Sequence, residues 1–185
     1  LTYEEVATVT DLEDLFLLEK NITSFEELEY FTAVTDIPAG LFENCKKLVS
    51  VKLPEGIRRL GNNAFANCES LKEIVIPEGY VGHHDDYNVV YEYQVFSGCS
   101  SLETVVLPST LKFLPGFRNC VSLKNITLPS AIESIPTECF YGCTSLATIT
   151  LNEGLTTIGS YAFQNCTALT AIEIPATVTN IGSNV

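Results

Sequence analysis

The chain has 185 residues, 46% of them hydrophobic and 18% charged, so it is long enough and apolar enough to fold around one continuous core. The formal net charge is −13, and the sequence contains no cluster of Lys or Arg that would offset it locally. This argues against nucleic acid and anionic lipid as partners. No apolar run approaches the roughly 18 residues that a membrane span requires, so we expect no direct membrane insertion by this segment.

Residues 1–24 do not share the repeat that follows and are predicted to form an N-terminal cap. Thr10 and Glu13 make a capping box, which predicts a short helix over residues 11–20. A helix here would cover the first repeat unit, because terminal units otherwise expose the edge of their core. The apolar residues that share one face of this helix are Leu12, Leu15 and Phe16.

From residue 25 onward the chain repeats a unit of about 23 residues. Leu recurs with steps of 23, 31, 21, 23 and 23 residues, and the same register aligns one Phe and, three residues later, one Cys in each copy. This periodicity is typical of a solenoid, in which each coil buries its core only by stacking on its neighbours. We therefore predict one solenoid domain over residues 25–185, with copies that start near Phe25, Leu48, Leu71, Leu102, Leu123, Leu146 and Leu169.

The first copy carries two competing signals. Phe25 and Leu28 keep the register of the strand residues in later copies. Ser24 and Glu27, however, make a second capping box. Strand and helix both remain open for this segment, and we favour helix as part of the cap.

Each later copy is predicted to contain a longer and a shorter strand. In the sixth copy, Ile149 and Leu151 point inward and their neighbours Thr148 and Thr150 outward, since side chains alternate along a strand. A proline ends this strand in most copies, because it donates no backbone hydrogen bond. A second apolar pair predicts the shorter strand on another side of the coil: Ile57 and Leu60, Leu111 and Leu114, Ile132 and Ile135, Leu155 and Ile158, and Val178 and Ile181.

A segment of the type Ala-Phe-x-Asn/Gly-Cys closes each coil, as in residues 64–68. It is typical of one helical turn that ends at a residue able to adopt the left-handed conformation. The aligned Phe residues are predicted to plug the coils: Phe42, Phe65, Phe96, Phe117, Phe140 and Phe163.

Six of the seven cysteines occupy one repeat position, and Cys139 takes the place of the core Ala. Stacked copies have parallel side-chain directions that suit bridging poorly, so we predict free, buried thiols. No CxxC pair exists, and metal ligation by these cysteines has still less support.

The outward positions of the long strands form a ladder that we expect to be the concave face. Strand propensity alone explains its stripe of small, β-branched residues, and a flat protein-docking surface is the functional interpretation. The stripe consists of Val75, Val106, Thr127 and Thr150.

The third copy is eight residues longer than the second, and this insertion holds both histidines of the chain. The simplest interpretation is a decorated loop whose tyrosines pack on its own base. Partner recognition is the sharper hypothesis, because exposed Tyr beside polar groups makes a good contact surface. Metal binding is a weaker alternative, since adjacent side chains diverge on extended backbone and no further ligand completes a site. We expect the insertion to project beside the concave face, with Tyr80, His83, His84, Asp85, Asp86, Tyr87, Tyr91 and Tyr93 as candidate contacts.

The pattern LxxIxLPxxIxxIGxxAFxxC resembles the BspA-like leucine-rich repeat family, which is found largely in surface proteins of host-associated bacteria. The resemblance covers about residues 25–185. It implies a curved, right-handed leucine-rich repeat solenoid, an extracellular or cell-surface location, and a role in adhesion or protein binding without enzyme activity. The departures are the long third copy, the short fourth copy, and Asn152 in place of Pro.

Function is therefore predicted to be partner binding without a cofactor, metal or catalytic residue. A structural spacer that presents another domain is the alternative. Val185 falls one residue before the core Phe position, so we expect the seventh copy to be truncated.

Overall fold

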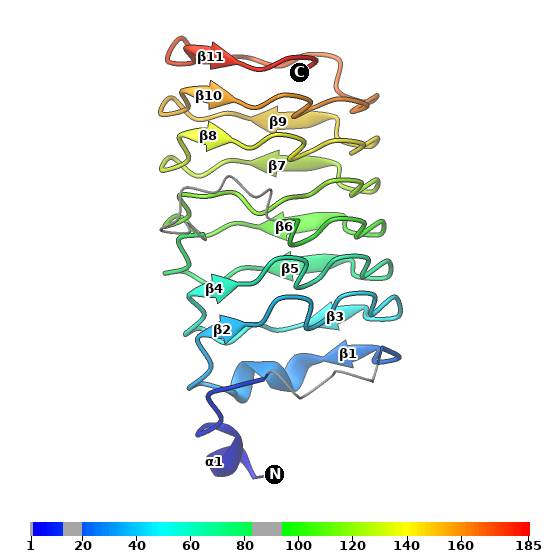
Figure 1. Ribbon diagram of the computed structural model, residues 1–185, viewed down its shortest axis with the longest axis vertical. Helices are drawn as coiled ribbons and strands as arrows, with labels where there is room; N and C mark the ends of the chain where they lie inside the picture. Colours follow the sequence, from blue (N-terminus) through cyan, green and yellow to red (C-terminus); the bar gives the residue numbers. More distant parts are fainter. Residues whose placement is uncertain (1, 13–19, 83–93) are drawn as a thin grey trace.

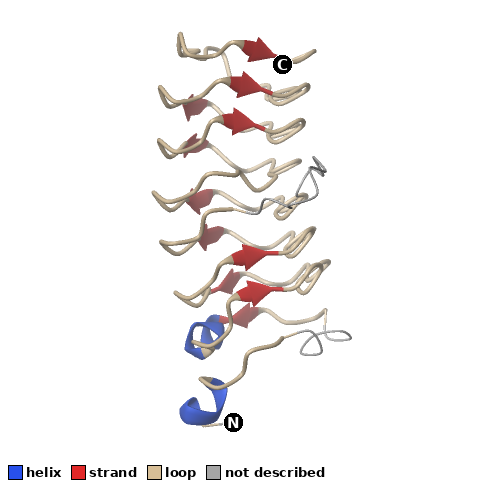
Figure 2. Ribbon diagram, turned by 60° about the vertical axis from the view of Figure 1, so that its left-hand side comes forward, coloured by secondary structure: helices blue, strands red, loops and turns tan. Residues whose placement is uncertain are grey.

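The computed structural model describes residues 2–12, 20–82 and 94–185 and shows a β-solenoid. Its coils, numbered one to seven after the seven copies, stack in one column with the chain ends at opposite ends (Figure 1). Long and short strands lie on different sides of the column (Figure 2). The long strands are β1 (Ser24–Phe25), β3 (Ser50–Val51), β5 (Glu73–Val75), β6 (Thr104–Val106), β7 (Asn125–Thr127) and β9 (Thr148–Thr150). The short strands are β2 (Asp36–Ile37), β4 (Arg59–Leu60), β8 (Ser134–Ile135), β10 (Thr157–Ile158) and β11 (Asn180–Ile181).

The N-terminal end begins with a helix that we did not predict, α1 (Tyr3–Val6). Thr2 and Glu5 form its capping box: the Thr2 amide donates to the Glu5 carboxylate at 2.7 Å, and the Glu5 amide donates to the Thr2 hydroxyl at 3.3 Å. The predicted helix over residues 11–20 lies mostly outside the described residues. Leu12, at its start, is buried in the core, and the half-buried Val6 and Val9 pack against that core.

The first copy forms a strand and then a short helix, although the N-cap of the helix is Phe25 and not the Ser24 of the predicted capping box. Ser24 and Phe25 form β1 and pair with β3, and the chain then turns into the 3₁₀ helix η1 (Glu26–Tyr30). Leu28 is the buried residue of η1. Our preference for helix over residues 25–31 was therefore right for residues 26–30 and wrong for Phe25, which is in β1, and for Phe31, which follows the helix.

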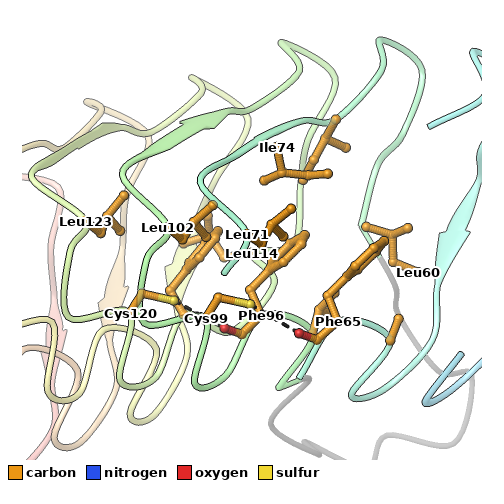
Figure 3. Packing of buried hydrophobic residues seen from close by; sticks show 14 of the residues in the cluster. Leu60, Phe65, Leu71, Ile74, Phe96, Cys99, Leu102, Leu114, Cys120 and Leu123 are labelled. Carbon is orange, nitrogen blue, oxygen red and sulfur yellow. Dashed lines mark hydrogen bonds between the residues drawn. The ribbon is translucent and has the colours of Figure 1, made fainter. Parts of the chain in front are cut away.

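The core is a stack of equivalent side chains from successive coils. The ring centroids of Phe65 and Phe96 are 5.5 Å apart and the rings are nearly parallel (Figure 3). The stack extends from Phe42 to Phe163. Each such aromatic pair contributes about 0.5–1.5 kcal/mol beyond the burial of apolar area. A residue with positive φ ends the turn after each Phe, as predicted: Asn44, Asn67, Gly98, Asn119, Gly142 and Asn165.

The seven cysteines are free and buried, as predicted, and five of them make a repeated hydrogen bond. The Cys99 thiol donates to the Phe65 carbonyl of the preceding coil at 3.1 Å, and the Cys120 thiol donates to the Phe96 carbonyl at 3.2 Å (Figure 3). Each Phe carbonyl also accepts the backbone N–H of the Cys in its own coil. The same thiol bond recurs at Cys68, Cys143 and Cys166.

The strands pair in a pattern that the sequence did not predict. We expected one continuous ladder, but the long strands pair in twos, as β1 with β3, β5 with β6, and β7 with β9, all parallel. The short strands follow the same grouping, with β2 beside β4 and β8 beside β10 and β11. The predicted short strand at Leu111 and Leu114 is absent from the described structure, although both residues are buried.

Asn152, which replaces the usual proline, ends its strand through its side chain. The amide nitrogen donates to the carbonyls of Pro129 at 2.8 Å and Ile132 at 2.9 Å, and the amide oxygen accepts from the Gly154 N–H at 2.7 Å. The coil therefore closes at this corner without proline.

Candidate functional site

The long-strand face, which we define as the outward side chains of β3, β5, β6, β7 and β9, is the predicted binding surface. Val75 and Val106 are opposite each other across β5 and β6 and remain 56% and 47% exposed. Thr127 and Thr150 are opposite each other across β7 and β9 and are also exposed. The four residues of the predicted stripe are therefore accessible and lie on one face.

Charged groups line the two edges of this face. At the strand starts, the Lys124 ammonium contacts the Glu103 carboxylate at 2.7 Å, and this hydrogen bond lowers the pKa of Glu103. At the strand ends, the Glu78 carboxylate accepts from the Ser109 N–H at 3.0 Å and from its hydroxyl at 2.9 Å, which lowers the pKa of Glu78. One edge thus carries a neutralised pair and the other an uncompensated negative charge.

A groove of about 420 Å³ opens on the long-strand face between coils four and five. Its floor includes Ile126 and Leu128, which are buried, and its rims include the exposed Val106 and Thr127. The groove is lined by Glu78, Thr104, Val105, Val106, Leu107, Ser109, Asn125, Ile126, Thr127, Leu128 and Pro129. Two of the predicted stripe residues therefore belong to a concave site, whereas Val75 and Thr150 lie on the flat surface beside it.

Tyr80 does not join this surface. Its side chain is 1% exposed and belongs to the core, at the repeat position of Ile57. The prediction of Tyr80 as an exposed contact is wrong, because the insertion begins later than we expected. The other predicted contacts of the insertion, His83, His84, Asp85, Asp86, Tyr87, Tyr91 and Tyr93, lie outside the described residues.

The described ends of the insertion lie on the short-strand side. The Val81 carbonyl accepts from the N–H groups of Lys112 and Phe113, and the Gln94 N–H donates to the Asn62 side chain. A Cβ added at Gly82 would come within 2.3 Å of the Phe113 carbonyl oxygen. The ends are therefore fixed on a different side of the coil from the long-strand face, and the direction in which the insertion projects lies outside the described residues.

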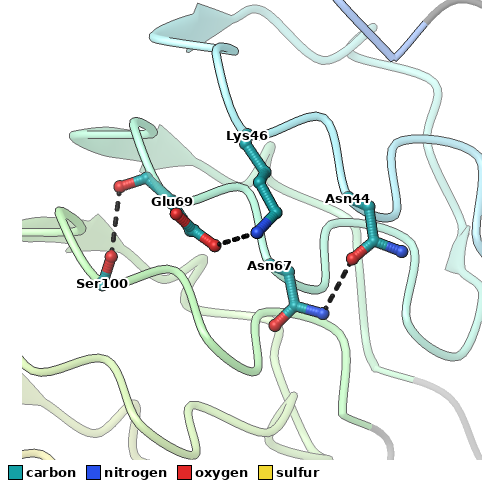
Figure 4. A network of polar contacts seen from close by, with 5 residues as sticks. All are labelled: Asn44, Lys46, Asn67, Glu69 and Ser100. Carbon is teal, nitrogen blue, oxygen red and sulfur yellow. Dashed lines mark hydrogen bonds and ion pairs between the residues drawn. The ribbon is translucent and has the colours of Figure 1, made fainter.

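Polar contacts elsewhere join neighbouring coils. Lys46 contacts Glu69 at 2.7 Å, the Ser100 hydroxyl donates to the Glu69 carbonyl, and the Asn67 amide donates to the Asn44 side chain at 3.0 Å (Figure 4). Each of these contacts joins residues of two neighbouring coils, so we assign the network to stabilisation of the stacked coils.

The buried thiols lack the features of a reactive or metal-binding site. Burial raises the pKa of Cys45 and of Cys166 from 9.0 to about 11, and it also raises the pKa of Cys120 well above its ordinary value. Reactive cysteines instead have lowered pKa values and partial exposure. Within the described ranges, no group of three or more His, Cys, Asp or Glu side chains is placed to hold a metal ion, and no helix is long and apolar enough to cross a membrane.

Sequence reasoning missed the groove residues Glu78, Ser109 and Pro129. The repeat alignment did predict Thr104 and Asn125 as outward strand positions. It could not predict the groove between their strands, because the alignment does not show which neighbouring strands pair by hydrogen bonds. Glu78 and Ser109 each follow a proline at the same repeat position in neighbouring copies. This alignment was the signal from which their hydrogen bond could have been predicted.

The sequence profile of the BspA type leucine rich repeat region matches residues 18–114 and 88–185, in 6 copies. The chain belongs to this family. A leucine-rich repeat protein of Bacteroides ovatus is 33% identical, with a TM-score of 0.72, over 82% of this chain and 37% of that one. A leucine-rich repeat protein of Eubacterium ventriosum is 29% identical, with a TM-score of 0.74, over 88% of this chain and 42% of that one.

A leucine-rich repeat protein of T. pallidum is 27% identical, with a TM-score of 0.60, over 79% of this chain and 70% of that one. The chain therefore spans less than half the length of the Bacteroides and Eubacterium proteins. Comparison with curated proteins gives no match. The family resemblance and the predicted leucine-rich repeat solenoid are confirmed.

Proposed function

We propose that this BspA-type repeat chain is a non-enzymatic protein-binding module of a secreted or cell-surface bacterial protein. It contacts its partner through the long-strand face and serves adhesion or another protein–protein interaction. The single observation that carries this proposal is the exposed stripe of Val75, Val106, Thr127 and Thr150 on paired strands. The strands already hold these side chains in one plane. Binding a partner therefore costs little conformational entropy at these positions.

Residues 83–93 are proposed as a second contact region. Exposed aromatic and polar side chains at loops are good contact residues, and the sequence of this segment contains three tyrosines, two histidines and two consecutive aspartates.

Binding to an array of matrix proteins and glycans tests the proposal with two matched variants. The face variant carries Val106→Arg and Thr127→Arg, and the control carries Ser134→Arg and Thr179→Arg, which are exposed on the short-strand side. Both add the same charge. Interface positions at the centre of a contact typically cost more than 1 kcal/mol when disrupted, so we expect an affinity loss of about tenfold for the face variant alone.

Equal losses in the two variants would show that charge, and not the long-strand face, controls binding. A chain that binds glycans but none of the proteins would also overturn the proposal. If the whole array gives no binding, the structural spacer becomes the supported function.

A further inference from the structure

The strand ladder on the long-strand face is interrupted where the groove lies. Within the described residues of β6 and β7, no backbone hydrogen bond joins the two strands, although each is paired with its other neighbour. Leu128 donates to the Thr150 carbonyl, and the Lys124 carbonyl accepts from Ala147, so the even-numbered residues of this strand face β9. Asn125 and Thr127 therefore direct their backbone groups toward β6.

The Cα atoms of β6 and β7 come within 8 Å of each other, so an added strand, which needs about 4.8 Å on either side, cannot enter between them. An extended chain can instead lie over the groove, where pockets for its alternate side chains supply the selectivity. Here the pocket has an apolar floor, because Ile126 and Leu128 are 3% and 4% exposed beneath the rims of Val106 and Thr127. β-Branched rims over an aliphatic floor suit a small aliphatic side chain.

The charges at the two ends of the groove favour particular partner residues on either side of that aliphatic side chain. Glu78 accepts only neutral donors from Ser109, and no described Lys or Arg forms an ion pair with it. At the other end, Glu103 is already neutralised by Lys124. The net charge of −13 adds a general preference for cations.

We propose that the groove between β6 and β7 binds an extended segment of a partner protein, with an aliphatic side chain over Ile126 and a Lys or Arg beside Glu78. This inference rests on the proposed protein-binding function and adds the chemistry of the partner. The groove extends along four residues of one strand, Thr104 to Leu107, which occupy about 13 Å at roughly 3.3 Å per residue, so four or five residues of a partner fill it.

NMR titration with short peptides tests the inference directly. The probe is acetyl-Lys-Thr-Val-Thr-Lys-amide, and the comparison peptides replace both Lys by Glu or the Val by Asn. We expect amide shifts concentrated at residues 104–107 and 125–128, and affinities at least fivefold weaker for both comparison peptides. Glu78→Gln should weaken the Lys peptide about two- to fivefold, as expected for an exposed ion pair.

Glu153→Gln is the matched control, because Glu153 is exposed at the equivalent corner of the sixth coil, away from the groove. It should leave the affinity within twofold. Gln at position 78 still accepts from Ser109, so superimposable spectra of the free variants are expected.

No shifts at millimolar peptide, shifts spread along the whole face, or equal affinity for the Glu peptide would overturn the inference. If the peptide fails while the Val106→Arg and Thr127→Arg variant still loses its protein partner, the groove assignment is wrong and the proposed function stands. If the peptide binds in the groove but that variant keeps its partner, the proposed function is wrong instead.

Discussion

The repeated cysteine is explained by a backbone carbonyl. In each of five coils the thiol supplies a second hydrogen bond to a Phe carbonyl of the preceding coil, for example at 3.1 Å from Cys143 to Phe117. The carbonyl already accepts one backbone N–H, and the thiol occupies its second lone pair, where a larger donor would not fit a core this closely packed. Position-specific hydrogen bonding therefore accounts for the cysteines better than redox chemistry does.

Alkaline pH should destabilise the protein through these thiols. Burial raises the pKa of Cys45 and Cys166 from 9.0 to about 11, so the unfolded chain loses these protons first as the pH rises. Their stabilisation is complete below pH 9 and is lost between about pH 9 and 11, at about 2–3 kcal/mol per thiol. Urea unfolding at pH 8 and pH 10.5 measures this change.

The same experiment has an internal control in thiol titration. Without reductant, the native protein should show almost no reactive thiol and the denatured protein seven. Stability that is independent of pH up to 11, or few reactive thiols after denaturation, would contradict the assignment of buried, reduced cysteines.

Gly159 is required by close backbone contact. A Cβ at this position would lie 2.4 Å from the Thr137 nitrogen and 2.7 Å from the Pro136 carbonyl carbon. Backbone atoms cannot rotate away, so we expect Gly159→Ala to cost about 2–4 kcal/mol in the free energy of unfolding, the range of severe overpacking. Gly154→Ala is the control, since its nearest contacts are 3.0 and 3.1 Å away. Equal effects of the two substitutions in urea unfolding would refute this explanation.

At the scale of elements, the sequence predicted positions well and strand pairing poorly. Inward and outward residues of β5, β7 and β9 follow from period-two alternation, and the turns follow from Phe, Asn and Gly register. Pairing in twos depends on small displacements between coils that identical repeats do not encode. The short helix α1 was missed because its capping box precedes only four helical residues.

The start of the insertion was also misplaced, for a physical reason. Tyr80 looks like a loop residue beside a Gly, yet it fills the aliphatic position of Ile57 in the core. An aromatic residue was not expected there because the other copies have Ile, Leu or Val. The groove was predicted only through its rims, Val106 and Thr127.

Residues 83–93 are predicted to be dispensable for folding. Their replacement by Leu-Gly-Asn, the sequence of residues 60–62, restores the spacing of the second coil. Circular dichroism should be unchanged, and the free energy of unfolding should change little because loop length costs only about 0.6 kcal/mol per doubling.

A deletion of eight residues that starts at Gly79 is the matched comparison. It removes Tyr80 from the core and should cost at least about 1.5–3 kcal/mol. If the Leu-Gly-Asn replacement unfolds as readily as this deletion, residues 83–93 are part of the core and the prediction is wrong.

At the scale of the whole molecule, the coils are grouped as one with two, three with four, and five with six and seven. Strand ladders join the members of each group, whereas the Phe stack and the backbone bonds beside it run through the whole column. The column is therefore continuous on its aromatic side and interrupted on its long-strand side.

This grouping predicts uneven hydrogen exchange in the free protein. The Leu128 amide donates to Thr150, whereas the Thr127 amide faces the interrupted edge, so Thr127 should exchange at least tenfold faster. Ile76, which donates to Val106, should behave like Leu128. Equal protection of the Thr127 and Leu128 amides would mean that β6 and β7 are joined in solution.

Photo-crosslinking of a partner protein tests the binding face most directly. A photoreactive side chain replaces Val106 on the long-strand face or Ser134 on the short-strand side, both of which are exposed. With a protein partner bound at saturation, the account predicts a covalent adduct from position 106 and none from position 134. An adduct from position 134 alone would contradict it.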